Sequence, residues 1–99
     1  MIKHIVTWKL KAADDAGKAE AFATIASNLT ALVPVIKQIK SLTVGRNVAS
    51  PESNWDLALV AQYDSLAALQ AYQEHPEHQR VAAVIRELVS DKSAVDFEL

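Results

Sequence analysis

The chain has 99 residues, enough for one domain, predicted over residues 1–99, and too few for a second hydrophobic core. Ten basic and twelve acidic residues leave a net charge of -2 without a run of lysine or arginine, which excludes the basic footprint of a nucleic-acid-binding protein. Cysteine is absent, so disulfides, thiolate nucleophiles and cysteine-ligated metal centres are excluded. No stretch approaches the length of a membrane span and lysines interrupt the first apolar segment, so we expect no signal peptide and predict a cytoplasmic protein.

The first part of the chain predicts a strand followed by a helix. Residues 2–11 alternate with period two, which is typical of a strand. One side of this strand carries an apolar row that includes a histidine: Ile2, His4, Val6, Trp8 and Leu10. Asp14 and Asp15 then favour a helix start, and apolar residues recur at spacings of three and four until Pro34. The apolar face of this helix is expected to hold Ala19, Phe22, Ile25, Ala26, Leu29, Leu32 and Val33.

The second part predicts a hairpin, a broken helix and a last strand. Alternation returns over residues 39–47 and again over residues 55–63, with a polar loop between them, which indicates a β-hairpin. Ser65 stands at the N-cap of a second helix. Pro76 divides that helix into two pieces, because proline is tolerated only in the first turn of a helix. Residues 94–99 alternate once more and predict the final strand.

The predicted order, β-α-β-β-α-β, is the split βαβ plan of ferredoxin-like α+β domains, with four antiparallel strands and the helices on one face. We expect the helices on the face that holds Trp8 and Leu57. The other face then carries a mixed row of residues: Ile5, Thr7, Ala58 and Val60. Such a row is poorly suited to water, and the sheet of a second copy would cover it. The sequence therefore predicts a homodimer that forms a dimeric α/β barrel.

His4 lies in phase with the apolar row of the first strand, so its imidazole is expected beneath the helices. A polar group in that position needs a hydrogen-bonding partner. Two interpretations stay open at this point. His4 is either a core histidine satisfied by one hydrogen bond, or a catalytic or ligand-binding group.

The stretch HPEH at residues 75–78 is the most distinctive short motif of the chain. Pro76 suits the first turn of a new helix, and the two histidines around it either cap and decorate the kink or meet His4 from the helix side. Two imidazoles in one pocket can hold a proton between them and serve as acid and base. Tyr72 is either a core aromatic or the source of a phenolic hydroxyl in the same pocket.

Three histidines also suggest a metal site, since three imidazoles with an open position describe catalytic zinc. The spacing argues against it, because two of them are three residues apart across a proline and no HExxH motif is present, so no metal is predicted. Asp56, Asp96 and Glu98 are expected on strand faces away from the helices, in solvent or facing a dimer partner. No glycine-rich phosphate loop, serine elbow or catalytic carboxylate pair is present, and no cofactor is predicted.

Several segments together resemble the stress-responsive A/B barrel domain family, also called the Dabb family. They are the opening MIKHIVTWKLK, the helix end LVPVIK, then VGRN, the strand and helix WDLALVAQYDSLAALQAYQEHPEHQ, and the closing VDFEL. The likeness covers nearly the whole chain, and the combination of MIKHIV with YQEHPEHQ is its specific part. The resemblance implies a ferredoxin-like domain that associates by its sheet into a dimeric α+β barrel.

The resemblance also implies a pocket between helices and sheet. In a polyketide cyclase of this family, olivetolic acid cyclase, a strand-one histidine and the second histidine of the HPxH motif serve an intramolecular aldol condensation, and these positions match His4 and His78. A pocket tyrosine matches Tyr72, whereas a further one on the first helix has no match, because Ile25 and Ala26 occupy that region. The residues expected to contact a substrate are Val6, Trp8, Phe22, Ala26 and Val81.

Three functions stay open. The first is a cofactor-independent, cyclase- or lyase-like enzyme on a small carbonyl or polyketide-like compound, with His78 as base, His4 as its hydrogen-bonded partner and Tyr72 orienting the substrate oxygen. The second is a protein that binds a small apolar ligand without transforming it. The third is a structural stress-response homodimer, in which side chains fill the pocket and the two histidines satisfy one another. A monooxygenase on the same barrel plan is a further alternative that no residue favours.

Overall fold

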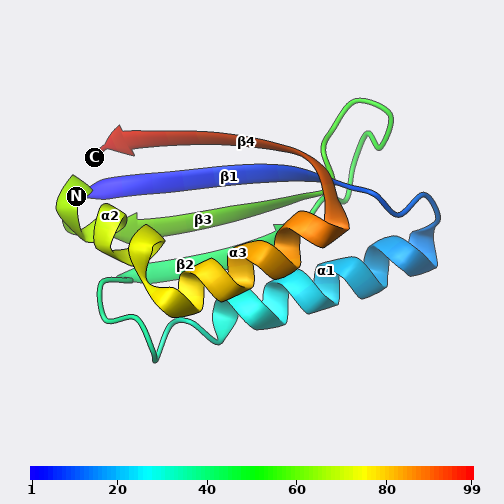
Figure 1. Ribbon diagram of the computed structural model, residues 1–99. Helices are drawn as coiled ribbons and strands as arrows, with labels where there is room; N and C mark the ends of the chain where they lie inside the picture. Colours follow the sequence, from blue (N-terminus) through cyan, green and yellow to red (C-terminus); the bar gives the residue numbers. More distant parts are fainter.

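The computed structural model describes residues 1–99, and its seven elements follow the predicted order, with the second helix in two pieces (Figure 1). The elements are β1 Ile2–Leu10, α1 Asp15–Thr30, β2 Ser41–Arg46, β3 Leu57–Tyr63, α2 Leu66–Glu74, α3 Pro76–Leu88 and β4 Val89–Glu98. Four antiparallel strands form one sheet, and the helices pack on one of its faces, so the ferredoxin-like α+β prediction is confirmed. No helix is long and apolar enough to cross a lipid bilayer.

Helix α1 begins where its capping residue predicts and ends earlier than predicted. Asp14 Oδ1 accepts a hydrogen bond from the Gly17 amide at 2.8 Å, which satisfies one of the free donors of the first turn. The helix ends at Thr30, four residues before Pro34, and the chain continues in turns. Val33, expected on the apolar helix face, lies beyond this end and is exposed, and Ala19, inside the helix, is exposed as well.

The predicted break in the second helix is confirmed. Ser65 caps α2 by accepting a hydrogen bond from the Ala68 amide at 3.1 Å. His75 ends α2 and also caps α3, because its Nδ1 accepts a hydrogen bond from the Glu77 amide at 3.1 Å. Pro76 is the first residue of α3, where its missing N–H costs nothing. The break matters for function because it places the residues after Pro76 in the first turn of a helix that lies along the sheet.

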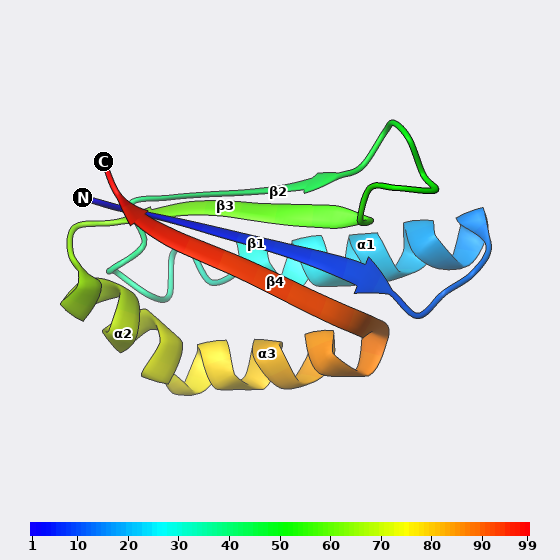
Figure 2. The same cartoon turned by 90° about the horizontal axis from the view of Figure 1, so that it is seen from above.

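The strands are ordered β2-β3-β1-β4, so β1 is central and β4 forms one edge. Directly opposite residues of antiparallel neighbours point to the same side of a sheet. Trp8 lies opposite Leu57 and Val6 opposite Leu59, and all four are buried on the helix side, as expected. Figure 2 shows α1 and α3 running side by side along this face. Eighteen buried apolar residues from the two layers form one continuous core.

Strand β4 differs from its prediction in both length and facing. It begins at Val89, directly after α3, and not at residue 94. Its register pairs Asp96 with His4 of β1, so the Asp96 carboxylate points to the helix side of the sheet. The prediction that Asp96 faces away from the helices is therefore wrong. Alternation fixes only which residues share a face, and the pairing with β1 decides which face that is.

The same register corrects the placement of Glu98 and of the apolar residues around it. Glu98 also points to the helix side, where its exposed carboxylate lies 3.8 Å from the ammonium of Met1. Val95 and Phe97 consequently point outward, opposite Ile5 and Lys3 of β1, and remain 59% and 41% exposed. The outer face of the sheet thus carries more apolar surface than the sequence pattern predicts.

Asp56 was also expected away from the helices, and that prediction is wrong. Its carboxylate accepts a hydrogen bond from the Leu10 amide at 2.7 Å and from the Lys18 ammonium of α1 at 3.0 Å. Burial acts to raise the pKa of Asp56, but the Leu10 amide and the Lys18 charge outweigh it and hold that pKa below its usual value. The Asp56 contacts therefore connect β1 and α1 to the residue just before β3. Strand β3 itself begins at Leu57, two residues later than predicted.

Candidate active site

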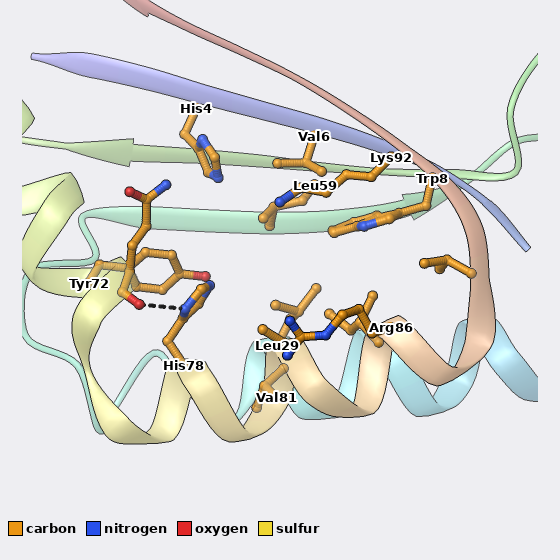
Figure 3. A pocket seen from close by; sticks show the side chains of 14 residues that line it. His4, Val6, Trp8, Leu29, Leu59, Tyr72, His78, Val81, Arg86 and Lys92 are labelled. Atoms are coloured by element: carbon orange, nitrogen blue, oxygen red, sulfur yellow. Dashed lines mark hydrogen bonds between the residues drawn. The ribbon is translucent and has the colours of Figure 1, made fainter.

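A cavity of about 240 Å³ lies between the sheet and the helices, with β1 and β4 on one side and α3 on the other (Figure 3). Fourteen residues line it, and nine of them are hydrophobic. Three other depressions contain neither histidine nor tyrosine: two, of about 500 and 570 Å³, lie around the loop between β2 and β3, and one, of about 260 Å³, lies beside the start of α1. The cavity beside α3 is therefore the one in which imidazole and phenol side chains lie within a mostly hydrophobic lining, as is usual for a ligand-binding site.

Six of the eight residues predicted for the site line this cavity. They are His4, Val6, Trp8, Tyr72, His78 and Val81. Phe22 and Ala26 do not line it, although both were expected to contact a substrate. These two residues lie on α1, whereas the helix wall of the cavity is formed mainly by α3, and α1 contributes only Leu29.

His78 rises from the first turn of α3 beside the Tyr72 ring, with the two ring centres 4.4 Å apart. Its Nδ1 lies 3.0 Å from the Gln73 carbonyl oxygen, and because a carbonyl only accepts, Nδ1 carries the hydrogen. Burial lowers the pKa of His78 below its ordinary value of 6.5, and the Lys92 ammonium acts in the same direction. His78 is therefore neutral at neutral pH, with an unpaired Nε2 that can accept a proton.

His4 points from β1 into the same cavity and is only 6% exposed. Its Nδ1 is hydrogen-bonded to the carboxylate of Asp96, the residue directly opposite on β4. Because an ionised carboxylate only accepts, Nδ1 carries the hydrogen and Nε2 is left for the cavity. A carboxylate behind an imidazole fixes the tautomer and the orientation of the ring, as the aspartate does in Ser-His-Asp triads.

Tyr72 lies at the α2 end of the cavity, and its ring forms a buried pair with that of Tyr63, with the ring centres 4.9 Å apart. Both hydroxyls are fully buried, and no protein group outside the pair makes a hydrogen bond to either of them. Burial raises the pKa of both phenols, so both are protonated at neutral pH. Only Tyr72 lines the cavity, and its hydroxyl lies beside the His78 ring in Figure 3. A buried hydroxyl whose hydrogen has no partner outside the pair favours a ligand oxygen as its acceptor.

His4 and His78 face the cavity from the sheet side and the helix side, but no hydrogen bond joins them. Each uses Nδ1 for a separate protein acceptor, which leaves two free Nε2 atoms over one cavity. His75 does not line the cavity and instead caps α3, in agreement with the simpler interpretation of that residue. No group of three or more His, Asp or Glu side chains is placed to hold a metal ion.

Sequence reasoning missed three charged residues of the site. Asp96 was not expected to contact His4, and Lys92 and Arg86 were not expected at the cavity, where both are exposed at its edge. Lys92 escaped notice because the last strand was predicted to begin after it. A strand beginning at Val89 places Lys92 in the helix-facing row with Asp96, four residues apart. Arg86 follows His78 by eight residues, a helical spacing that could have revealed it.

The fold and this cavity define a ferredoxin-like α+β domain with two histidines between its sheet and its helices. The family model of the stress responsive A/B barrel domain, named Dabb, matches residues 2–99. The chain belongs to this family. No curated protein matches the sequence.

Solved structures share the fold over almost the whole chain. A dimeric protein of unknown function from Bacteroides fragilis is 29% identical, with a TM-score of 0.88 over 99% of this chain and 95% of that chain. A dimeric ferredoxin-like protein of unknown function from Thermobifida fusca is 31% identical, with a TM-score of 0.78 over 99% and 90% of the two chains. The hydroxynitrile lyase from Passiflora edulis is 13% identical, with a TM-score of 0.80 over 97% and 90%, a likeness of fold alone.

Proposed function

We propose that the protein is a cofactor-independent, cyclase- or lyase-like enzyme that moves a proton on a small carbonyl compound. His78 is the base and returns the proton, the His4–Asp96 pair holds a second imidazole against the substrate, and Tyr72 orients the substrate oxygen. The observation that carries this proposal is the neutral His78 imidazole, whose Nδ1 is bound by the Gln73 carbonyl while Nε2 has no protein partner. A base held in one tautomer, next to an apolar cavity, suits abstraction of a carbon-bound proton.

The proposed step begins with a ketone or aldehyde in the cavity, its carbonyl oxygen at the Tyr72 hydroxyl. His78 Nε2 takes a proton from the carbon next to the carbonyl, and the electrons of that C–H bond form a carbon–carbon double bond as the carbonyl becomes an enolate. The Tyr72 hydroxyl donates a hydrogen bond to the enolate oxygen, which stabilises the charge as it forms. The protonated His78 Nε2 then returns a proton to the same carbon as the enolate returns to the carbonyl form, and the Asp96 carboxylate holds the His4 ring with its free Nε2 toward the substrate.

Further observations support this assignment over a purely structural role. A structural domain would fill the space between sheet and helices, whereas a cavity of about 240 Å³ lies there. The free hydroxyl of Tyr72 belongs to the lining, so the polar groups converge on the space where a ligand would lie. The Passiflora hydroxynitrile lyase supports the proposal only in that the same fold can house an enzyme.

The test is deuterium exchange at the carbon next to the carbonyl of phenylacetone, followed by NMR in heavy water with the intact protein. We expect the protein to accelerate exchange, and His78→Asn to lower the rate by about 10²- to 10⁴-fold, the usual contribution of a general base. His75→Asn is the matched control, because it changes a histidine that caps α3 outside the cavity. Equal exchange with wild type and His78→Asn would refute the assignment.

The second candidate is a protein that holds a ligand in the cavity without transforming it, which the mostly hydrophobic lining favours. In that case phenylacetone would bind and shift the NMR signals of the lining residues, and exchange would proceed at the rate of the buffer alone. The same experiment therefore separates the two candidates.

We also propose that two copies pair through the outer face of the sheet. Val95 and Phe97 lie exposed there, next to the half-buried Ile5 and Val60. Apolar residues gathered on an open sheet face are typical of an interaction surface. The dimeric state of the Bacteroides and Thermobifida structures supports this pairing. Light scattering coupled to size-exclusion chromatography measures the state directly, and a monomer at all concentrations would contradict the proposal.

A further inference from the structure

We infer that the cavity takes a small carboxylate with an apolar body, whose carboxylate lies at Lys92 and Arg86 while its carbonyl lies at the Tyr72 hydroxyl, beside His78. The inference deepens the proposed function by naming a class of substrate, and it rests on that function for the role of His78. It is carried by the distribution of charge around the cavity, which differs from that of the chain as a whole.

The cavity is positive although the chain is negative. The whole chain carries a formal charge of -2, but the fourteen lining residues include two cations, Lys92 and Arg86, and no aspartate or glutamate. The carboxylate of Asp96, behind His4, is already engaged by that imidazole. An apolar cleft with charges of one sign focuses the electric field and attracts ligands of the opposite sign.

Neither cation has a partner in the protein. The ion pairs of the chain involve other groups, and Lys92 and Arg86 donate no side-chain hydrogen bond. Figure 3 shows Lys92 on the sheet side of the cavity and Arg86 on the helix side, so the two face the opening from opposite walls. The Lys92 charge also reaches His78, whose protonation it opposes. A carboxylate suits this arrangement, because a guanidinium binds its two oxygens with parallel hydrogen bonds.

The dimensions limit the rest of the ligand. A volume of about 240 Å³ is below the roughly 300–1,000 Å³ typical of sites for drug-sized molecules, so the ligand is compact. Between the cations and the tyrosine hydroxyl the lining is aliphatic or indole, from Val6, Trp8 and Val81. The ligand class is thus a single ring or short chain with a carboxylate at one end and a carbonyl at the other.

The test compares 3-phenylpropanoate with 3-phenylpropanamide, which share a shape and differ in charge. Trp8 lines the cavity and Trp55 is the only other tryptophan, so a Trp55→Phe background makes fluorescence report on the cavity. We expect the acid to bind about tenfold more tightly than the amide, as charge-assisted hydrogen bonds imply. The preference should shrink as sodium chloride is added, since salt screens exposed charges.

The double variant Lys92→Met with Arg86→Met keeps the aliphatic stems and should abolish the preference. Lys37→Met removes an exposed lysine that has no ion pair and lies outside the cavity, and it should leave the preference intact. Equal affinity for acid and amide, or no binding of either, overturns the inference, as does an equal loss in the control. The proposed function fails separately: an acid preference without deuterium exchange refutes the enzyme and leaves the carboxylate site in place.

Discussion

Strands β1 and β4 lie side by side and both alternate, yet their apolar rows face opposite ways. On β1 the row that contains Val6 points to the helices and is buried. On β4 Val95 and Phe97 point away from the helices and stay exposed, while the polar row that contains Asp96 faces the cavity. An apolar row in the sequence therefore predicts that one face of the strand is buried. It does not predict whether the helices of the same chain or another molecule bury that face.

The positions of the two strands in the sheet explain the difference. Strand β1 is central, so the core packs against its inner row along most of its length. Strand β4 is an edge strand, and its inner row lies beside the cavity. Lys92 and Asp96 of that row therefore lie outside the buried core. The apolar residues of β4 are then left for the outer face, where only another molecule can bury them.

The largest expected effect comes from a charge in the inner row of β1. Val6→Asp would bury an unpaired carboxylate among apolar side chains at a cost of several kcal/mol, a large part of the roughly 5–15 kcal/mol that stabilises a small domain. We expect no cooperative thermal transition by circular dichroism. A variant that melts like the wild type would show that the inner row of β1 tolerates a charge. The inner rows of β1 and β4 would then not differ in their contribution to stability.

The next effect comes from the same change in the outer row of β4. Val95→Asp leaves the helix-side core untouched, so the domain should fold but sediment as a monomer in analytical ultracentrifugation. Val48→Asp is the matched control, because Val48 is a loop residue that is 96% exposed, and it should leave the oligomeric state unchanged. Dimerisation of the Val95→Asp protein, or its failure to fold, would contradict the division of roles between the two rows.

Most of the fold follows from local signals in the sequence. Capping at Asp14 and Ser65, the break at Pro76 and the period-two rows are short-range patterns, and each corresponds to an observed element. The face that β4 presents does not follow from them. It depends on pairing between residues more than eighty positions apart, and a shift of one residue in that pairing would turn every side chain to the other face.

The site was predictable in part for the same reason. His4, Tyr72 and His78 could be named because the strand pattern, the HPEH motif and the family resemblance mark them, and the structure places all three at one cavity. Asp96 and Lys92 could not, since each owes its place to the register of β4 on β1. The catalytic roles of His4, Tyr72 and His78 are predictions that the deuterium-exchange experiment tests.

A smaller effect is expected from the polar row of β4. Asp96→Asn keeps the shape of the side chain but removes the charge that holds His4 Nδ1–H, and should lower the free energy of unfolding by about 1 kcal/mol. Urea denaturation measures the change, and ¹⁵N NMR of the His4 ring should show loss of the single tautomer. Glu98→Gln, in the same row but exposed, should change stability by less than about 0.5 kcal/mol. Equal effects of the two variants would show that the His4 contact contributes nothing specific.

The smallest effect concerns the opposite wall of the cavity, where His78 is half-buried without a carboxylate partner. Its pKa is lowered in the folded protein, so on acidification the unfolded chain takes up this proton first, near the ordinary value of 6.5. Between that value and the lowered folded pKa, the unfolded state binds more protons, and the free energy of unfolding falls as the pH falls. His78→Gln cannot titrate, so its urea midpoint should fall less than that of the wild type between about pH 7.5 and about pH 5.5. Because the other histidines are common to both proteins, the difference between the two profiles isolates His78. If the urea midpoints of the two proteins fall equally with pH, burial does not disfavour the charged form of His78. The folded protein would then not keep His78 in the neutral form that the proposed base requires.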